Sequence, residues 1–260
     1  MVRRIIFRHV ALAIAFVVSV VCAAPVKAQA DDSLFQKKLY AGANGAQMPY
    51  RLYVPANYDA KAKYPLVLWL HGANGRGNDN VLQISAGNSL GTHIWTKPEN
   101  QAKFPAFVLA PQCPADTFWP RPRGSEPPEP LRLALEILDA VQKEYSIDPD
   151  RVYVAGQSMG GEGTWAALRY APGRFAAGIP LCGYLTPEEA ASVAHVPVWI
   201  FQGEADPIVS VTGAREFVAA LKKAGGTPRY NEYPGVGHQV WERAFAEPEL
   251  VAWLAAQKRQ

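Results

Sequence analysis

A pentapeptide that can carry nucleophilic chemistry spans Gly156 to Gly160 and reads Gly-Gln-Ser-Met-Gly. It directly follows the apolar run Val152 to Ala155 and leads into a helix-like stretch, Gly161 to Tyr170. Where a strand turns sharply into a helix, a serine at the tip is exposed, and flanking glycines leave room for close packing. The pattern predicts Ser158 as a nucleophile. The alternative is a glycine-rich turn with an ordinary surface serine.

A serine hydroxyl attacks efficiently only when a base takes its proton and an acid orients that base. On a strand-turn-helix elbow of this kind, both partners follow the serine, first the acid and then the histidine. Asp206 follows the strand-like run Val196 to Phe201, and His238 follows the run Pro228 to Tyr233. The chain order therefore predicts Asp206 as the acid and His238 as the base.

The other candidates for these two roles are fewer and less well placed. His71 ends a strand, His93 is expected in a polar loop, and His195 immediately precedes a strand, so each is predicted to be structural. For the acid, Glu204 and Glu232 remain alternatives, with Asp206 then acting as a turn or cap residue.

A glycine-rich loop from His71 to Asn80 follows the strand-like run Leu66 to Leu70. Acyl transfer places negative charge on the carbonyl oxygen, and preorganised backbone N–H groups stabilise that charge. We expect one donor to be the N–H of Met159, the residue after the nucleophile, and the other to be the N–H of Ala73. A phosphate cradle is disfavoured because the Walker ending and the spaced Rossmann glycines are both absent.

The first 30 residues have the pattern of an export signal. A start with three arginines is followed by an apolar run from Val10 to Cys22 and by Ala-Gln-Ala ending at Ala30. This pattern predicts a secretory signal peptide cleaved after Ala30, and a secreted or periplasmic protein. A retained membrane anchor is the alternative, although the apolar run is short for a bilayer span.

Cleavage at that point would remove four Lys or Arg residues and no acids, so the formal charge of +3 would fall to about −1. The mature chain then has no basic stripe, which argues against nucleic-acid binding and against membrane binding after cleavage. The hydrophobic content of 49% in the full chain suits a large core. We therefore expect residues 31–260 to form a single catalytic domain.

Strand-like and helix-like segments alternate along this domain, which predicts an α/β fold with a mostly parallel sheet and helices on both faces. The expected strands are Lys37 to Tyr40, Tyr50 to Val54, Leu66 to Leu70, Phe107 to Ala110, Val152 to Ala155, Ala177 to Leu181, Val198 to Phe201 and Arg229 to Tyr233. The first two are expected to be antiparallel edge strands. The expected helices are Gly161 to Tyr170, Glu129 to Tyr145, Gly213 to Lys223, Gln239 to Phe245 and Glu249 to Gln257.

Two cysteines, Cys113 and Cys182, remain after the predicted cleavage. They end strands that we place three positions apart in the sheet, or about 14 Å. Because a disulfide needs Cα atoms within about 7 Å, we expect two buried free thiols.

The motifs above resemble those of the α/β-hydrolase superfamily. Within it the chain is similar to small secreted esterases labelled predicted peptidases, phospholipase/carboxylesterase-like or feruloyl-esterase-like. The segments that carry the resemblance are Leu70 to Ala73, Ala110 to Pro114, Gly156 to Gly161, Gln202 to Pro207 and Gly237 to Trp241. The resemblance implies the α/β-hydrolase fold, with Ser158, Asp206 and His238 as the catalytic triad. Glu162 departs from the pattern, since relatives should have an aromatic or apolar residue there.

The interval from Cys182 to His195, where such folds insert a cap, is short and predicts a minimal cap and an open cleft. Such a cleft suits esters of large or polymeric alcohols. Trp119, in a proline-rich loop, is expected to border the cleft and bind substrate; its alternative role is to anchor the loop. Gln157 is a second candidate for substrate binding. Arg121 and Arg123 are expected on a solvated loop face; contact with an anionic group of the substrate is the alternative.

The preferred function is a secreted carboxylic ester hydrolase that acts on a small-molecule or polymer-linked ester, such as an aryl, feruloyl or short-acyl ester. A serine peptidase of the prolyl-oligopeptidase lineage and a non-catalytic binding protein are the alternatives. Neither His-Glu-x-x-His nor paired Cys-x-x-Cys occurs, so no metal and no other cofactor is predicted. The sequence does not determine an oligomeric state.

Overall fold

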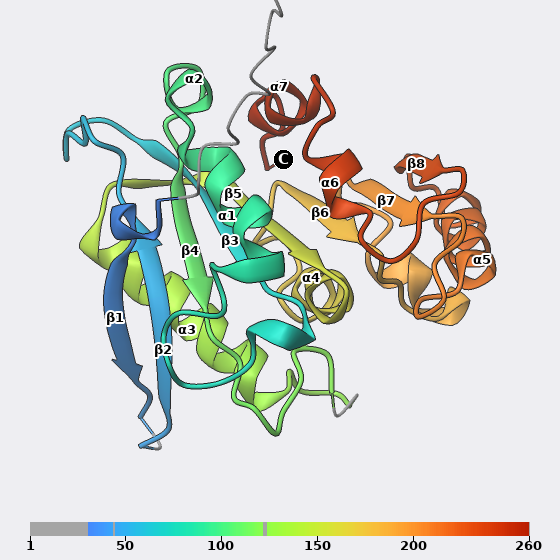
Figure 1. Cartoon of the computed structure of the whole chain (residues 1–260), viewed down its shortest axis with the longest axis horizontal. Helices are drawn as coiled ribbons and strands as arrows, with labels where there is room; N and C mark the ends of the chain where they lie inside the picture. Colours follow the sequence, from blue (N-terminus) through green and yellow to red (C-terminus); the bar gives the residue numbers. More distant parts are fainter. Residues whose placement is uncertain (1–30, 44, 122–123, 260) are drawn as a thin grey trace, which may run out of the picture.

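The computed structural model describes residues 31–43, 45–121 and 124–259 (Figure 1). The predicted signal peptide, residues 1–30, and Arg123 lie outside these described residues. Within the described part of the chain, no helix has both the length and the apolar character needed to cross a membrane.

A sheet of eight strands runs from an N-terminal edge, blue in Figure 1, to a C-terminal edge, red. The strands in spatial order are β1 (Gln36–Ala41), β2 (Gln47–Tyr53), β4 (Phe107–Pro111), β3 (Tyr64–Leu70), β5 (Ile147–Gln157), β6 (Ala177–Leu181), β7 (Trp199–Gly203) and β8 (Arg229–Tyr233). β2 pairs antiparallel with β1 and β4, and the other neighbouring strands are parallel. The predicted α/β sheet, with two antiparallel strands at one edge, is confirmed.

The central strands are continuous apolar runs because both faces of the sheet are covered. All residues of β3, β6 and β7 are buried. β5 is longer than predicted, since it begins at Ile147, and its register with β3 shifts between Tyr64 and Leu66. Asp148-Pro149-Asp150 resembles a turn in the sequence, yet its backbone stays extended within β5.

Helices pack on both faces of the sheet and enclose two hydrophobic cores (Figure 1). One core contains residues of α3 (Glu129–Glu144), α4 (Met159–Tyr170) and α5 (Val211–Lys223). The other contains residues of α1 (Ser89–Thr96), α6 (Trp241–Ala244) and α7 (Leu250–Ala255). The other short elements that the described residues form are α2 (Pro98–Gln101) and the 3-10 turns η1 (Asp32–Leu34), η2 (Ala73–Gly75), η3 (Ala86–Asn88) and η4 (Pro187–Ser192).

Helix α1 contradicts the expectation that His93 lies in a polar loop. His93 is on α1 and buried, with Nδ1 2.9 Å from the carbonyl oxygen of Ser89. The sequence of α1 does not indicate a helix, because Gly91, Thr92 and Thr96 have low helix propensity. A Cβ at Gly91 would lie 1.9 Å from the ring of Trp69, so the glycine is what lets α1 pack closely on the sheet.

The segment between β6 and β7 contains the six-residue turn η4, which packs against α5. Its N-terminus is a capping box, in which Glu189 accepts the backbone N–H of Thr186. The minimal cap predicted from the short Cys182 to His195 interval is confirmed in this part of the chain.

Cys113 and Cys182 are both free and buried, as predicted. They follow β4 and β6, and two strands, β3 and β5, lie between those two strands in the sheet. This separation keeps the thiols beyond the reach of a disulfide.

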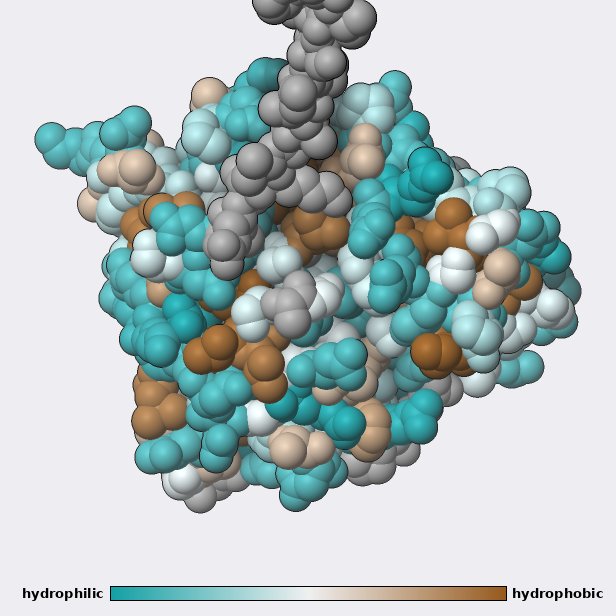
Figure 2. All heavy atoms as spheres, viewed as in Figure 1, coloured by the Kyte–Doolittle hydropathy of each residue, from teal (hydrophilic) through white to brown (hydrophobic). Residues whose placement is uncertain are grey.

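The surface in Figure 2 is mostly hydrophilic, with hydrophobic residues gathered in small separate patches. Among the residues that the structure describes, the exposed large hydrophobic ones are Leu34, Leu39, Leu82, Leu90, Phe118 and Ile208. Ile208 is the most exposed of these, at 71%.

Candidate active site

Ser158 lies between β5 and α4 with φ of 55° and ψ of −119°. A positive φ is unfavourable for a residue with a side chain, so the surrounding structure must hold it. One such constraint is the hydrogen bond from the Ser158 N–H to the carbonyl oxygen of Leu181, at 2.9 Å. This bond ties the elbow to the end of β6.

The glycines around Ser158 are required by close approach of backbone to backbone. A Cβ at Gly156 would lie 2.2 Å from the carbonyl oxygen of Gly160, and one at Gly160 would lie 1.8 Å from that of Leu70. A Cβ at Gly161 would lie 2.2 Å from the carbonyl oxygen of Leu181. The elbow therefore packs directly on the ends of β3 and β6, where no side chain fits.

The structure brings Ser158, His238 and Asp206 into one hydrogen-bonded chain. His238 Nε2 lies 2.8 Å from Ser158 Oγ, and His238 Nδ1 lies 2.8 Å from Asp206 Oδ2. The two alternative acids are engaged elsewhere, since Glu204 accepts the N–H of Gly235 and Glu232 pairs with Arg215. The geometry thus favours Asp206 as the acid.

The Asp206 side chain is fully buried and its two oxygens have defined partners. Oδ1 accepts the N–H groups of Ile208 at 2.8 Å and Val209 at 2.9 Å. Oδ2 accepts from Gln202 Nε2 at 3.3 Å and faces His238 Nδ1. Because a carboxylate only accepts, Nδ1 must carry a proton, and neutral His238 then offers Nε2 to the Ser158 hydroxyl.

The two predicted oxyanion donors, the N–H groups of Ala73 and Met159, each lie at the start of a helical element. Ala73 is the first residue of η2 and Met159 is the first residue of α4. An N–H group at the first position of a helix has no acceptor within the helix, so it is available to a ligand. Ala73 lines the same pocket as Ser158.

His71 supports the loop that carries Ala73. Its Nδ1 donates to the carbonyl oxygen of Gly72 at 2.7 Å, and its Nε2 accepts the N–H of Cys113 at 3.0 Å. Burial lowers the pKa of His71 to about 4, so the ring is neutral at pH 7 and this tautomer persists. Asn88 Oδ1 accepts the Gly72 N–H at 2.9 Å and fixes the same loop from another side.

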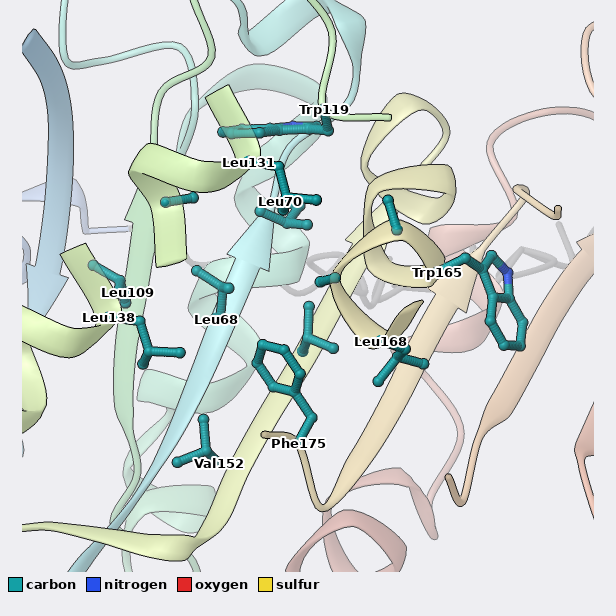
Figure 3. Packing of buried hydrophobic residues seen from close by; sticks show 14 of the residues in the cluster. Leu68, Leu70, Leu109, Trp119, Leu131, Leu138, Val152, Trp165, Leu168 and Phe175 are labelled. Carbon is teal, nitrogen blue, oxygen red and sulfur yellow. The ribbon is translucent and has the colours of Figure 1, made fainter. Parts of the chain in front are cut away.

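The prediction that Trp119 borders the cleft is wrong. Trp119 is fully buried, and its Nε1 donates to the carbonyl oxygen of His71 at 3.1 Å. Figure 3 shows its ring lying over Leu70 and Leu131, inside the core. A buried indole needs a partner for its N–H, and the His71 carbonyl supplies one. Trp119 therefore anchors the proline-rich loop, which was the alternative role.

Glu162, the departure from the family pattern, forms an ion pair with Arg121 at 3.7 Å. Arg121 belongs to the proline-rich loop and lies over the ring of Phe118, 5.9 Å from its centroid. A carboxylate in the first turn of α4 is also favoured by the helix dipole. The pair joins α4 to the loop that Trp119 anchors.

A pocket of about 220 Å³ opens over Ser158. Its lining residues are Gly72, Ala73, Asn74, Gly87, Asn88, Gln157, Ser158, Ile208, His238 and Trp241. Gln157, a predicted substrate-binding residue, lies in the wall, with its Nε2 donating to the carbonyl oxygen of Gly87 at 2.8 Å. Trp241 and Ile208 were not predicted as lining residues; the only sequence signal was that each follows a triad candidate by two or three positions.

Among the described residues, one group has the spacing of metal ligands, namely Cys182, Asp206 and His238. Two of its members are already hydrogen-bonded to each other. Burial raises the pKa of the Cys182 thiol, so the sulfur stays protonated and is a poor ligand. The group is better described as the hydrogen-bonded pair of Asp206 and His238 with the buried Cys182 beside it.

This sheet, with a serine elbow after β5 and a short segment in place of a cap, defines an α/β-hydrolase. Residues 42–259 match the Esterase family, described as "Putative esterase", so the chain belongs to that family. It is a carboxylic ester hydrolase.

Three similar proteins agree with this assignment. A probable carboxylesterase SOBER1-like protein of Arabidopsis thaliana is 25% identical over 76% of this chain and 80% of its own length. A probable feruloyl esterase C of Aspergillus terreus is 27% identical over 68% of this chain and 62% of its own. The crystal structure of a thermostable esterase superposes with a TM-score of 0.83 at 37% identity, covering 88% of this chain. This chain spans 64% of the length of that esterase.

Proposed function

We propose that this protein hydrolyses carboxylic esters through Ser158, His238 and Asp206, by way of an acyl-enzyme. The observation that carries this proposal is the hydrogen-bonded chain from Ser158 Oγ through His238 to the buried Asp206, with both bonds at 2.8 Å. It satisfies the geometric requirement for a nucleophile, a base within hydrogen-bond reach, and a group that orients the base.

In the first half-reaction, Ser158 Oγ attacks the ester carbonyl while His238 Nε2 takes its proton. The oxyanion that forms accepts the N–H groups of Ala73 and Met159. His238 then gives its proton to the alkoxide, which leaves as an alcohol. In the second half-reaction, water attacks the acyl-enzyme by the same steps, and the carboxylic acid is released.

The proposed substrates are aryl, feruloyl or short-acyl esters of carbohydrates or polymers. The support is the minimal cap, because η4 packs on α5 and leaves the pocket over Ser158 open to bulky groups. We also propose that the protein acts outside the cytoplasm as a single catalytic domain over residues 31–260, on the strength of the signal pattern ending at Ala30.

A fluorophosphonate probe and a small substrate panel test the proposal. We expect the probe to label Ser158, as read by peptide mass spectrometry, and p-nitrophenyl acetate and methyl ferulate to be hydrolysed. An aminoacyl anilide should be cleaved far more slowly. Faster cleavage of the anilide would favour a peptidase, and labelling at another residue would reassign the nucleophile.

A further inference from the structure

Two apolar residues, Trp241 and Ile208, line the pocket together with His238. Trp241 begins α6, and its ring centroid lies 5.7 Å from that of His238 with an interplanar angle of 85°. Ile208 follows Asp206 in the loop that holds the acid, to which its N–H donates. These two side chains therefore lie on the side of the pocket that holds the acid and the base.

The rest of the pocket has a different character. Asn74 belongs to the oxyanion loop, which is the glycine-rich loop from His71 to Asn80 that carries Ala73. Gly87 and Gln157 are joined by a hydrogen bond through the Gln157 amide. Asn88 uses its side chain to hold Gly72. The pocket is thus polar around the oxyanion loop and apolar around His238.

The direction of proton transfer determines which part of the ester lies beside the apolar side of the pocket. The imidazole that accepts the Ser158 proton must next donate it to the oxygen of the departing alcohol. That oxygen therefore sits beside His238 Nε2, and the alcohol extends along the neighbouring wall. The large apolar side chains that line the pocket with His238 are Trp241 and Ile208.

We propose that Trp241 and Ile208 bind the alcohol portion of the ester and select alcohols with a flat apolar face, either an aromatic ring or the C–H face of a sugar. This inference rests on the proposed function, because it uses His238 as the proton donor to the leaving group. An indole face favours flat partners, and an isoleucine exposed to water favours any apolar group that covers it.

The exposure of Ile208 supports this assignment independently of Trp241. At 71%, it is the most exposed of the large hydrophobic residues that the structure describes. Its N–H donates to Asp206, so its backbone is tied to the triad beside the pocket that its side chain lines. An apolar side chain on a constrained backbone is an efficient place to bury substrate surface, since less ordering is needed on binding.

The test compares specificity ratios within each variant, so that a general loss of activity cancels. Benzyl acetate and ethyl acetate differ in the alcohol, and their alcohols are similar in acidity. Comparing an acetylated methyl glucoside with ethyl acetate tests a sugar as the alcohol. Ethyl 3-phenylpropionate against ethyl acetate varies only the acyl group.

In Trp241→Ala, we expect the kcat/KM ratio of benzyl acetate or of the acetylated glucoside to ethyl acetate to fall roughly three- to tenfold. The substrate whose ratio falls shows which type of alcohol, aromatic or sugar, Trp241 favours. The acyl ratio should change less than about twofold, and Trp241→Phe should retain most of the preference. Ile208→Ser should lower the same alcohol ratio, and Ile208→Val should not.

Trp253→Ala is the matched control, because Trp253 packs on Trp199 at 5.4 Å, outside the pocket lining. Unchanged alcohol ratios in Trp241→Ala, or an equal fall in the acyl ratio, would overturn the inference while leaving the esterase assignment in place. A wild-type protein that hydrolyses none of these esters and is not labelled at Ser158 would overturn the proposed function itself.

Discussion

Ser158 combines a strained backbone with a hydroxyl that contacts His238 and has no structural role in the elbow. The positive φ is maintained by the N–H bond to Leu181 and by the flanking glycines, none of which involves Oγ. The side chain and the fold are therefore separable at this residue.

We predict that Ser158→Ala loses nearly all esterase activity, by a factor on the order of 10⁴ or more, and unfolds at the same urea concentration as the wild type within error. Steady-state kinetics and urea titration measure the two effects. Ser192→Ala, at an exposed serine bonded to the carbonyl of Glu189, is the control that should retain full activity. Retention of more than a few per cent of the activity in Ser158→Ala would show that the nucleophile is misassigned.

A substitution that changes one atom of Asp206 tests whether this residue is the acid that orients His238. In Asp206→Asn, one position of the carboxylate becomes an NH₂ group, which cannot accept the Nδ1 proton of His238. The imidazole would turn to the wrong tautomer, so kcat/KM at pH 7 should fall on the order of 10³- to 10⁴-fold with little change in fold. Glu204→Gln and Glu232→Gln should stay within about threefold of wild type; a large loss in either one instead would make it the acid.

The elbow between β5 and α4 packs backbone against backbone, so its glycines are needed because no side chain fits there. A Cβ at Gly160 would meet the carbonyl oxygens of Leu70, the last residue of β3, and of His71 directly after it, and these backbone groups cannot rotate away as a side chain can. We predict that Gly160→Ala is destabilised by about 2 kcal/mol or more and loses most activity, as measured by urea titration and ester hydrolysis. Gly124→Ala, where no atom lies within 4 Å of the added Cβ, should behave like the wild type.

The glycine-rich loop that carries Ala73 is sensitive to acid through His71. Its pKa in the folded protein is about 4, below the ordinary histidine value of 6.5, because burial disfavours the charged ring. Between these values the unfolded state binds more protons, so the free energy of unfolding falls as pH drops from 6.5 toward 4, by up to about 3 kcal/mol. Arg76, whose Nε donates to the Ala73 carbonyl, adds to this effect because its charge also disfavours a cation at His71.

Urea titrations from pH 7 to pH 4 measure this slope. His71→Asn retains a donor near the position of Nδ1 but has no imidazole to protonate. It should be less stable at pH 7, since the N–H of Cys113 loses its acceptor, and its stability should depend less on pH in this window. A slope as steep as that of the wild type would place the acid sensitivity elsewhere.

Sequence patterns predicted some elements well and missed others for physical reasons. β3 and the serine elbow are determined by local features, a continuous apolar run and a glycine pattern, and both were found. Helix α1 was missed because its fit comes from Gly91 against Trp69, a contact between distant parts of the chain. Trp119 and Trp241 are the same residue type, and their sequence neighbourhoods do not reveal which of them borders the pocket. Only the tertiary structure shows that Trp119 is buried beside His71 and that Trp241 lines the pocket.

At the scale of the whole molecule, the two cores hold the ends of β5, β7 and β8 in one place, and the segment between β6 and β7 stays short. η4 is the element between β6 and β7, and it lies against α5. The pocket of about 220 Å³ over Ser158 is therefore small in volume but accessible from outside. Such an architecture places a steric limit on the part of the ester inside the pocket and little limit on the part that projects from it.

We predict that enlarging the alcohol beyond its first ring has little effect on turnover. A feruloylated or acetylated trisaccharide should be hydrolysed with a kcat/KM within about threefold of the corresponding monosaccharide ester, because the added units remain in solvent and neither gain contacts nor meet a lid. Product release from each substrate, followed by liquid chromatography, gives the comparison. A capped hydrolase would instead lose activity steeply as the alcohol grows, so a fall of tenfold or more would mean that a part of the chain closes over Ser158 when substrate binds.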